Sequence, residues 1–74
     1  MYNWAFYNFL DDLLAKARSG YFKGNPKELA ESQSMFERGA KRFFLSREER
    51  RETMDGLRKC GIAISGDGNW KVST

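Results

Sequence analysis

Three arginines in the last third of the sequence, Arg47, Arg51 and Arg58, follow one another at spacings of four and seven residues. On a helix whose core positions are Met54 and Leu57, these spacings place all three side chains along one flank. A guanidinium is a planar fork that holds a phosphate, or the edge of a guanine, through two hydrogen bonds. The pattern therefore predicts an arginine ridge suited to lie against a nucleic-acid groove.

Further basic residues lie in the same half of the chain. Residues 1–37 carry four basic and five acidic side chains, a net charge of −1, whereas residues 38–74 carry nine basic and five acidic, a net charge of +4. Arg38, Lys41 and Arg42 precede the ridge and are expected to add phosphate contacts that set its orientation. Acidic side chains share the helix of the ridge, so a plain solvent-exposed face remains the alternative interpretation of "REERRE".

Catalytic and metal-binding chemistry find little support in these residue types. The chain has no histidine to act as a general base or a zinc ligand, and its single cysteine, Cys60, has no partner for an intrachain disulfide. The segment "SGDG" lacks the Gly-Lys-Ser/Thr ending of a phosphate-binding loop. We therefore expect no enzyme, no metal and no cofactor, and we interpret Cys60 as a small buried apolar residue.

The length and composition of the chain indicate the size and kind of domain that contains these residues. A chain of 74 residues, 15% of them aromatic, makes one small domain over residues 1–74, in which large rings supply much of the core. The apolar start "MYNWAFYNFLDDLL" has no basic flank, and no apolar run approaches the roughly 18 residues of a membrane span. The expectation is a soluble, cytoplasmic protein with no membrane partner, for which a homodimer stays open.

The first element is predicted to be a helix that begins after Asn3, its expected N-cap, and ends at Gly20. Its apolar residues recur at helical spacing: Phe6, Phe9, Leu10, Leu13, Leu14 and Ala17. Trp4 and Tyr7 lie beside this stripe and are expected to complete the core, the alternative being an exposed aromatic patch. The next segment, "GYFKG" at residues 20–24, is too short for an α-helix and is expected to be extended.

Three helix-start signals follow along the chain. They are Asn25-Pro26 with Glu28, Ser34 with Glu37, and Ser46 with Glu49. Helices are therefore predicted to begin near residues 26, 35 and 47, and a single helix over 26–44 is the alternative. The apolar face of this middle segment is expected to consist of Met35, Phe36, Ala40, Phe43 and Phe44.

The period of the sequence changes from helical to two after Gly61, a candidate helix C-cap. Ile62 and Ile64 alternate with small residues, and Trp70 and Val72 alternate with polar residues, on either side of the turn "GDGN". The predicted fold class is mainly α with a small β element, in which three to four helices precede a C-terminal β-hairpin.

Residues 46–72, "SREERRETMDGLRKCGIAISGDGNWKV", resemble a winged helix-turn-helix domain. The shared features are a serine-capped helix, "Gly-Ile" entering the first wing strand, a Gly-rich turn and an aromatic residue in the second strand. The resemblance implies a winged-helix-like fold whose recognition helix spans about 47 to 60. It also implies that "GYFKG" is a small strand and that Lys71 touches the nucleic-acid backbone from the wing.

Two functional hypotheses follow from the ridge and the resemblance. The first is a small regulatory protein that binds duplex DNA, with dimerisation expected, and acts in transcription or another DNA transaction. The second is a small inhibitor or adaptor, of the accessory type carried by viruses or mobile elements, that docks on an acidic surface of a larger host protein machine. The small size, the mixed charge, the aromatic N-terminus and Asp67 in the hairpin turn favour the second hypothesis.

Overall fold

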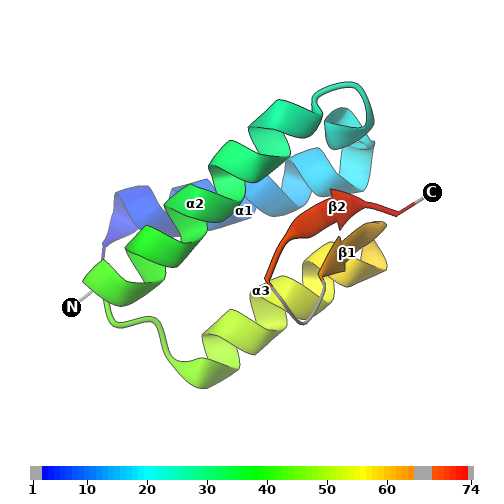
Figure 1. Ribbon diagram of the computed structural model, residues 1–74. Helices are drawn as coiled ribbons and strands as arrows, with labels where there is room; N and C mark the ends of the chain where they lie inside the picture. The colour runs from blue at the N-terminus through cyan, green and yellow to red at the C-terminus, as the bar shows by residue number, and fades with distance from the viewer. Residues whose placement is uncertain (1–2, 65–67, 74) are drawn as a thin grey trace.

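The computed structural model describes residues 3–64 and 68–73 (Figure 1). Most of this chain is helical, and a small antiparallel sheet lies at its C-terminal end. The elements are α1 (Trp4–Ser19), the 3-10 helix η1 (Tyr21–Lys23), α2 (Pro26–Arg42), α3 (Arg47–Lys59), β1 (Ile62–Ile64) and β2 (Trp70–Val72). The expectation of a mainly α chain with a small β element is confirmed.

All the elements share one core. α2 packs along α1, and α3 packs against α1 from another side (Figure 1). β1 contacts α3 and β2 contacts α2, so the hairpin closes the open side between these two helices. The buried apolar side chains are Phe6, Leu10, Leu13, Ala17, Phe22, Leu29, Phe36, Ala40, Leu45, Leu57, Ile62 and Trp70.

The start and end of α1 lie where the sequence predicts them. The Asn3 side chain accepts a hydrogen bond from the Phe6 amide at 2.8 Å, and Gly20 ends the helix. Of the two flanking aromatics, Tyr7 packs against the core and donates its hydroxyl to Glu49 Oε2 on α3 at 2.7 Å. Trp4 instead has 70% of its surface exposed. Tyr7 therefore completes the core as expected, and Trp4 does not.

The segment at residues 20–24 is not extended, which corrects the expectation from its sequence. It contains η1, which directs Phe22 into the core with 1% of its surface exposed. The Lys23 amide donates to the Gly20 carbonyl at 3.1 Å, so the turn satisfies its backbone locally and needs no sheet partner. Burial of Phe22 is a tertiary contact that the short sequence segment does not reveal.

α2 is one continuous helix, so the start predicted near residue 35 is wrong and the alternative of a single helix is confirmed. Leu29, Phe36 and Ala40 are buried at spacings of seven and four, and only an unbroken helix presents all three to the core. Asn25 and Glu28 do not cap this helix with their side chains. Instead, the Asn25 side-chain amide donates a hydrogen bond to the Tyr21 backbone carbonyl, and the Glu28 carboxylate accepts one from the Tyr21 hydroxyl. Both hydrogen bonds are 2.9 Å long.

Gly39 allows α1 and α2 to approach closely. A β-carbon at this position would lie within 3.0 Å of three atoms of the Phe6 ring. That ring is 6% exposed and packs against the rings of Phe9 and Phe43, with centroids 6.0 Å and 5.5 Å away. Because Phe9 and Phe43 pack against it, the Phe6 ring can move aside only by giving up these ring contacts.

The capping box predicted for α3 is present. The Glu49 amide donates to Ser46 Oγ at 3.1 Å, and the Ser46 amide donates to Glu49 Oε1 at 3.2 Å. Leu57 and Thr53 are buried, and Met54 packs against the edge of the core. The Thr53 hydroxyl donates to the Glu49 carbonyl at 3.0 Å, so this buried polar group is satisfied. Leu57 is therefore a core position, as predicted, whereas Met54, the other predicted core position, is only half-buried.

The predicted hairpin follows α3 directly. Half-buried Cys60 caps the helix, and Gly61, at φ 87°, takes the left-handed conformation that turns the chain into β1. The strand pairs are Ile62 with Val72, Ala63 with Lys71, and Ile64 with Trp70. Part of the expected turn, Gly66 and Asp67, lies outside the described residues.

We expect Gly39→Ala to lower the free energy of unfolding by about 1–3 kcal/mol, because the clash with Phe6 outweighs a gain in helix propensity of about 1 kcal/mol. Gly56→Ala, inside α3, is the matched control. Its β-carbon would meet the flexible end of the half-buried Leu14 side chain at 2.9 Å, so it should be neutral or stabilising. Urea unfolding measures both variants, and a stabilised Gly39→Ala variant would contradict the close contact.

Stability in acid should depend on the contact between α1 and α3. Hydrogen bonds from the Tyr7 hydroxyl and from Ser46 hold the pKa of Glu49 below its ordinary value of 4.5. A carboxyl whose pKa is lowered by folding adds stability above pH 4.5 and loses it as the pH falls through the folded-state pKa. We expect Tyr7→Phe to flatten the fall in melting temperature below pH 4.5, because Glu49 then loses the hydrogen bond that lowers its pKa most. Identical acid profiles for wild type and Tyr7→Phe would refute this role.

Candidate nucleic-acid interface

The arginine ridge lies on the solvent side of α3. Arg47, Arg51 and Arg58 are all exposed, and the helix buries Thr53 and Leu57 on another side. At 100° per residue the three arginines fall within about 40° of one another around the helix axis. They therefore share one exposed flank, as their spacing predicts.

One member of the ridge has an acidic neighbour. Arg58 Nη1 lies 3.1 Å from Asp55 Oδ1, and both side chains are about half exposed. Arg51, four residues before Asp55 on the helix, is the ion-pair partner that sequence spacing alone would favour. A solvent-exposed ion pair of this kind is worth little in free energy, so Arg58 can exchange Asp55 for a stronger anion.

A second group of basic side chains lies between α2 and α3. A small pocket of about 160 Å³ is lined by Arg38 and Lys41 of α2 and by Arg50 of α3, together with Glu37. Three cations and one carboxylate leave the pocket with excess positive charge, which suits a phosphate oxygen better than a cationic ligand. Two of the expected phosphate-contacting residues, Arg38 and Lys41, are therefore placed beside α3.

Arg50 is a pocket residue that the sequence pattern did not predict. It is half-buried, because it lies between the exposed flank and the core side of α3. The position of Arg50, seven residues before Leu57, was the signal in the sequence. This spacing places the stem of the Arg50 side chain near the buried side of the helix. Arg47, three residues before it, belongs to the ridge, so the same projection also places Arg50 next to that flank.

Two predicted residues point elsewhere. Arg42 lines a different groove, between α1 and α2, where its guanidinium lies 5.8 Å from the centre of the Phe43 ring. Lys71 is exposed on β2 opposite Ala63, on the face of the hairpin away from buried Trp70. The structure thus brings together Arg38 and Lys41 beside Arg50 of α3, and it does not place Arg42 in that pocket.

Gln33 fixes the hairpin against α2. Its side-chain amide donates to the Gly68 carbonyl, and its oxygen accepts from the Trp70 amide at 2.9 Å. The Trp70 ring packs on Phe36, with centroids 5.4 Å apart. Sequence reasoning missed Gln33, because a polar residue on a helix carries no sign of the strand backbone that it will meet.

The described residues contain no group of three or more histidine, cysteine, aspartate or glutamate side chains that could hold a metal ion. Among the same residues, each helix is too short or too polar to cross a lipid bilayer. In comparisons with protein-family models, with curated proteins and with solved structures, nothing matches this chain. Its function therefore has to be inferred from its own geometry.

We expect Gln33→Ala to loosen the hairpin without unfolding the helices. Both backbone groups of the hairpin would lose their side-chain partner, so the Trp70 amide should exchange with solvent about tenfold faster. Ser34→Ala, at an exposed position of the same helix, is the control and should leave this exchange unchanged. Equal protection of Trp70 in all three proteins would show that Gln33 does not hold the strand.

Proposed function

We propose that this chain is a small winged-helix-like regulatory protein that binds duplex DNA through α3. The observation that carries the proposal is the exposed flank of Arg47, Arg51 and Arg58, next to the positively charged pocket between α2 and α3. Phosphates supply most of the affinity of proteins for DNA, and arginine side chains in a groove supply much of the base recognition.

The order of the elements supports the winged-helix part of the proposal. A first helix, a short connecting turn, two further helices and a terminal hairpin follow one another as in that family (Figure 1). The chain departs from the family where η1 stands in place of the small strand expected at residues 20–24. This difference lies beside Cys60 and Gly61, at the C-terminal end of α3, and not beside its first turns, which carry Arg47 and Arg51.

The parts of the surface have separate roles in this proposal. Arg38, Lys41 and Arg50 would hold a phosphate and set the angle of α3, while Arg47 and Arg51 would reach the bases. The capping box keeps the first turn of α3 regular, which orders the backbone under Arg47. One module makes few contacts with DNA, so a second copy bound to an adjacent half-site would be needed for high specificity.

Gel-shift titration with a mixed-sequence duplex of about 20 base pairs tests the proposal, since two half-sites need about this length. Binding should weaken steeply between low and moderate salt. The triple variant Arg47→Ala, Arg51→Ala, Arg58→Ala should bind more weakly, and its salt slope should fall by about 0.9 for each phosphate that the variant no longer neutralises.

The matched control removes the same charge from another surface. Arg18, Lys23 and Lys27 are exposed and lie outside the pocket and the ridge, so their triple change to alanine should leave most of the binding intact. Absence of duplex binding at low salt, or equal losses in both triple variants, would contradict the proposal. A protein partner that binds the ridge after nuclease treatment would favour the acidic-surface hypothesis instead.

A further inference from the structure

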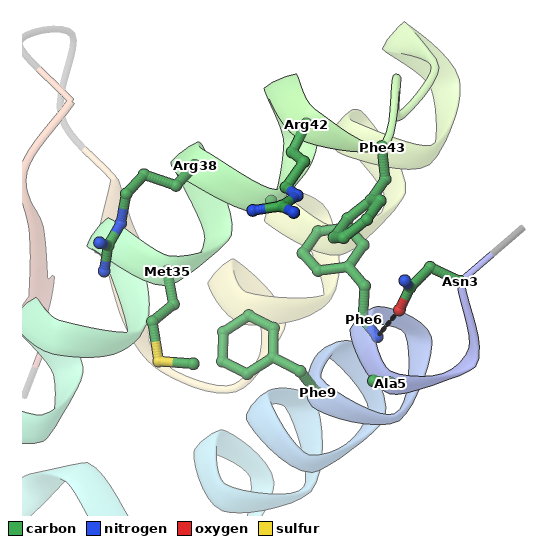
Figure 2. A pocket seen from close by; sticks show the side chains of 9 residues that line it. Asn3, Ala5, Phe6, Phe9, Met35, Arg38, Arg42 and Phe43 are labelled. Carbon is green, nitrogen blue, oxygen red and sulfur yellow. Dashed lines mark hydrogen bonds between the residues drawn. The ribbon is translucent and has the colours of Figure 1, made fainter. Parts of the chain in front are cut away.

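A second concave surface opens on the other side of α2. It is a shallow groove of about 450 Å³ between the first turns of α1 and the last turns of α2 (Figure 2). Phe6, Phe9 and Phe43 form its aromatic part, and Met35 lies along it with 49% of its surface exposed. A volume of this size is enough to bury several apolar side chains of a ligand.

The aromatic part of the groove is already ordered. The Phe6 and Phe9 rings stack at an interplanar angle of 24°, and Phe6 is wedged between Gly39 and Phe43. A binding surface that is rigid before the ligand arrives loses little conformational entropy on binding. The groove is therefore suited to a defined docking contact.

Positive charge borders this apolar surface. Arg38 and Arg42 stand on the α2 side of the groove (Figure 2), and none of the described acidic side chains lines it. The first turn of α1, next to the groove at Asn3, also contains no acidic residue that would offset the partial positive charge of the helix start. Carboxylates on a ligand would therefore find attractive partners along one side of the groove.

Phe44, which directly follows the groove residue Phe43 in the chain, is an unusual exposed aromatic. The sequence pattern predicts it on the apolar face of α2, but its side chain is 84% exposed. Its backbone has φ 54°, a left-handed conformation that is unfavourable for a bulky residue. Neither local conformation nor burial within the chain explains a phenylalanine here, whereas contact with a partner would.

We propose that this groove docks an acidic amphipathic helix of another protein. Apolar side chains spaced i, i+4 and i+7 on that helix would cover Phe9, Met35 and Phe44, and its flanking carboxylates would meet Arg38 and Arg42. Arg38 and Arg42 favour an acidic occupant at this end of the groove, whereas Asp12, Glu28 and Glu31 line the adjoining hollow that shares Phe9 and Met35. Nucleic acid would leave the aromatic surface uncovered, and a second copy of this chain is the alternative occupant that the self-association measurement tests. This surface is distinct from the ridge on α3.

The direct test uses a panel of fluorescent peptides of about 15 residues, long enough to form a helix on binding. Leu, Ile, Phe or Met occupies the i, i+4 and i+7 positions, and the flanking positions carry either Glu only or Lys only. We expect members of the Glu series to bind at tens of micromolar or better, and the Lys series to bind at least about tenfold more weakly. Amide chemical-shift changes should map to the groove.

Two variants of the groove should weaken binding about tenfold each. Phe44→Asn removes the exposed ring but suits the left-handed backbone, so it should melt no lower than wild type. Arg42→Gln removes one rim charge, and its matched control is Arg18→Gln, since both arginines are exposed in the last turn of a helix. The control should bind the peptides as wild type does.

Three outcomes would overturn the proposal. One is failure of every Glu-series peptide to bind at about 100 µM, well above the expected range. Another is equal binding of the Lys series, and the third is peptide binding that Phe44→Asn leaves intact. Self-association, or binding to anionic vesicles, that depends on Phe44 in the absence of peptide binding would assign the groove to another occupant. DNA binding by the Phe44→Asn protein is measured separately and tests the arginine ridge, because Phe44 is not part of that ridge.

Discussion

The position of Trp70 is the constraint on which the rest of the structure depends. This side chain is 6% exposed, packs on Phe36 of α2, and stands opposite Ile64 of β1, the strand that contacts α3. Gln33 binds the Trp70 amide, so the strand cannot slide along α2 without breaking a hydrogen bond. Because the hairpin is fixed to α2 on one side and to α3 on the other, it sets how α3 presents its exposed flank.

α2 carries basic side chains to two different surfaces. Lys41 lines the small basic pocket beside α3, Arg42 lines the apolar groove beside α1, and Arg38 lines both. The excess positive charge of residues 38–74 is therefore divided between a polar surface and an aromatic one. Arginine fits both surroundings, because its planar head binds phosphates and carboxylates in the same bidentate manner and also packs on rings.

Several features that depend on neighbouring residues in the sequence were predictable, although the side-chain cap expected at Asn25 and Glu28 does not form. The caps at Asn3 and Ser46 and the period-two strands follow from short-range chemistry, and the structure contains all of them. Features that depend on residues distant in the sequence were not predictable. The segment at residues 20–24 forms η1 and not the expected strand, because Phe22 is buried in the core. Arg50 becomes a site residue only because α2 lies beside it. Ser34 illustrates the opposite kind of error. Ser34 and Glu37 form a helix-start signal, but no helix starts there because the core requires an unbroken helix.

Because the chain is small, exposed features that cost stability need a physical explanation. A domain of 74 residues has a net stability of only a few kcal/mol, so a strained, exposed phenylalanine costing about 1 kcal/mol is a sizeable share of it. Around the small basic pocket three cations outnumber the one carboxylate, Glu37, and this excess positive charge also has a cost in the free protein. Both costs are offset when an anion or an apolar partner is bound, because ligand binding stabilises the folded state by mass action. The two surfaces should therefore be the places where binding raises the stability of this protein most.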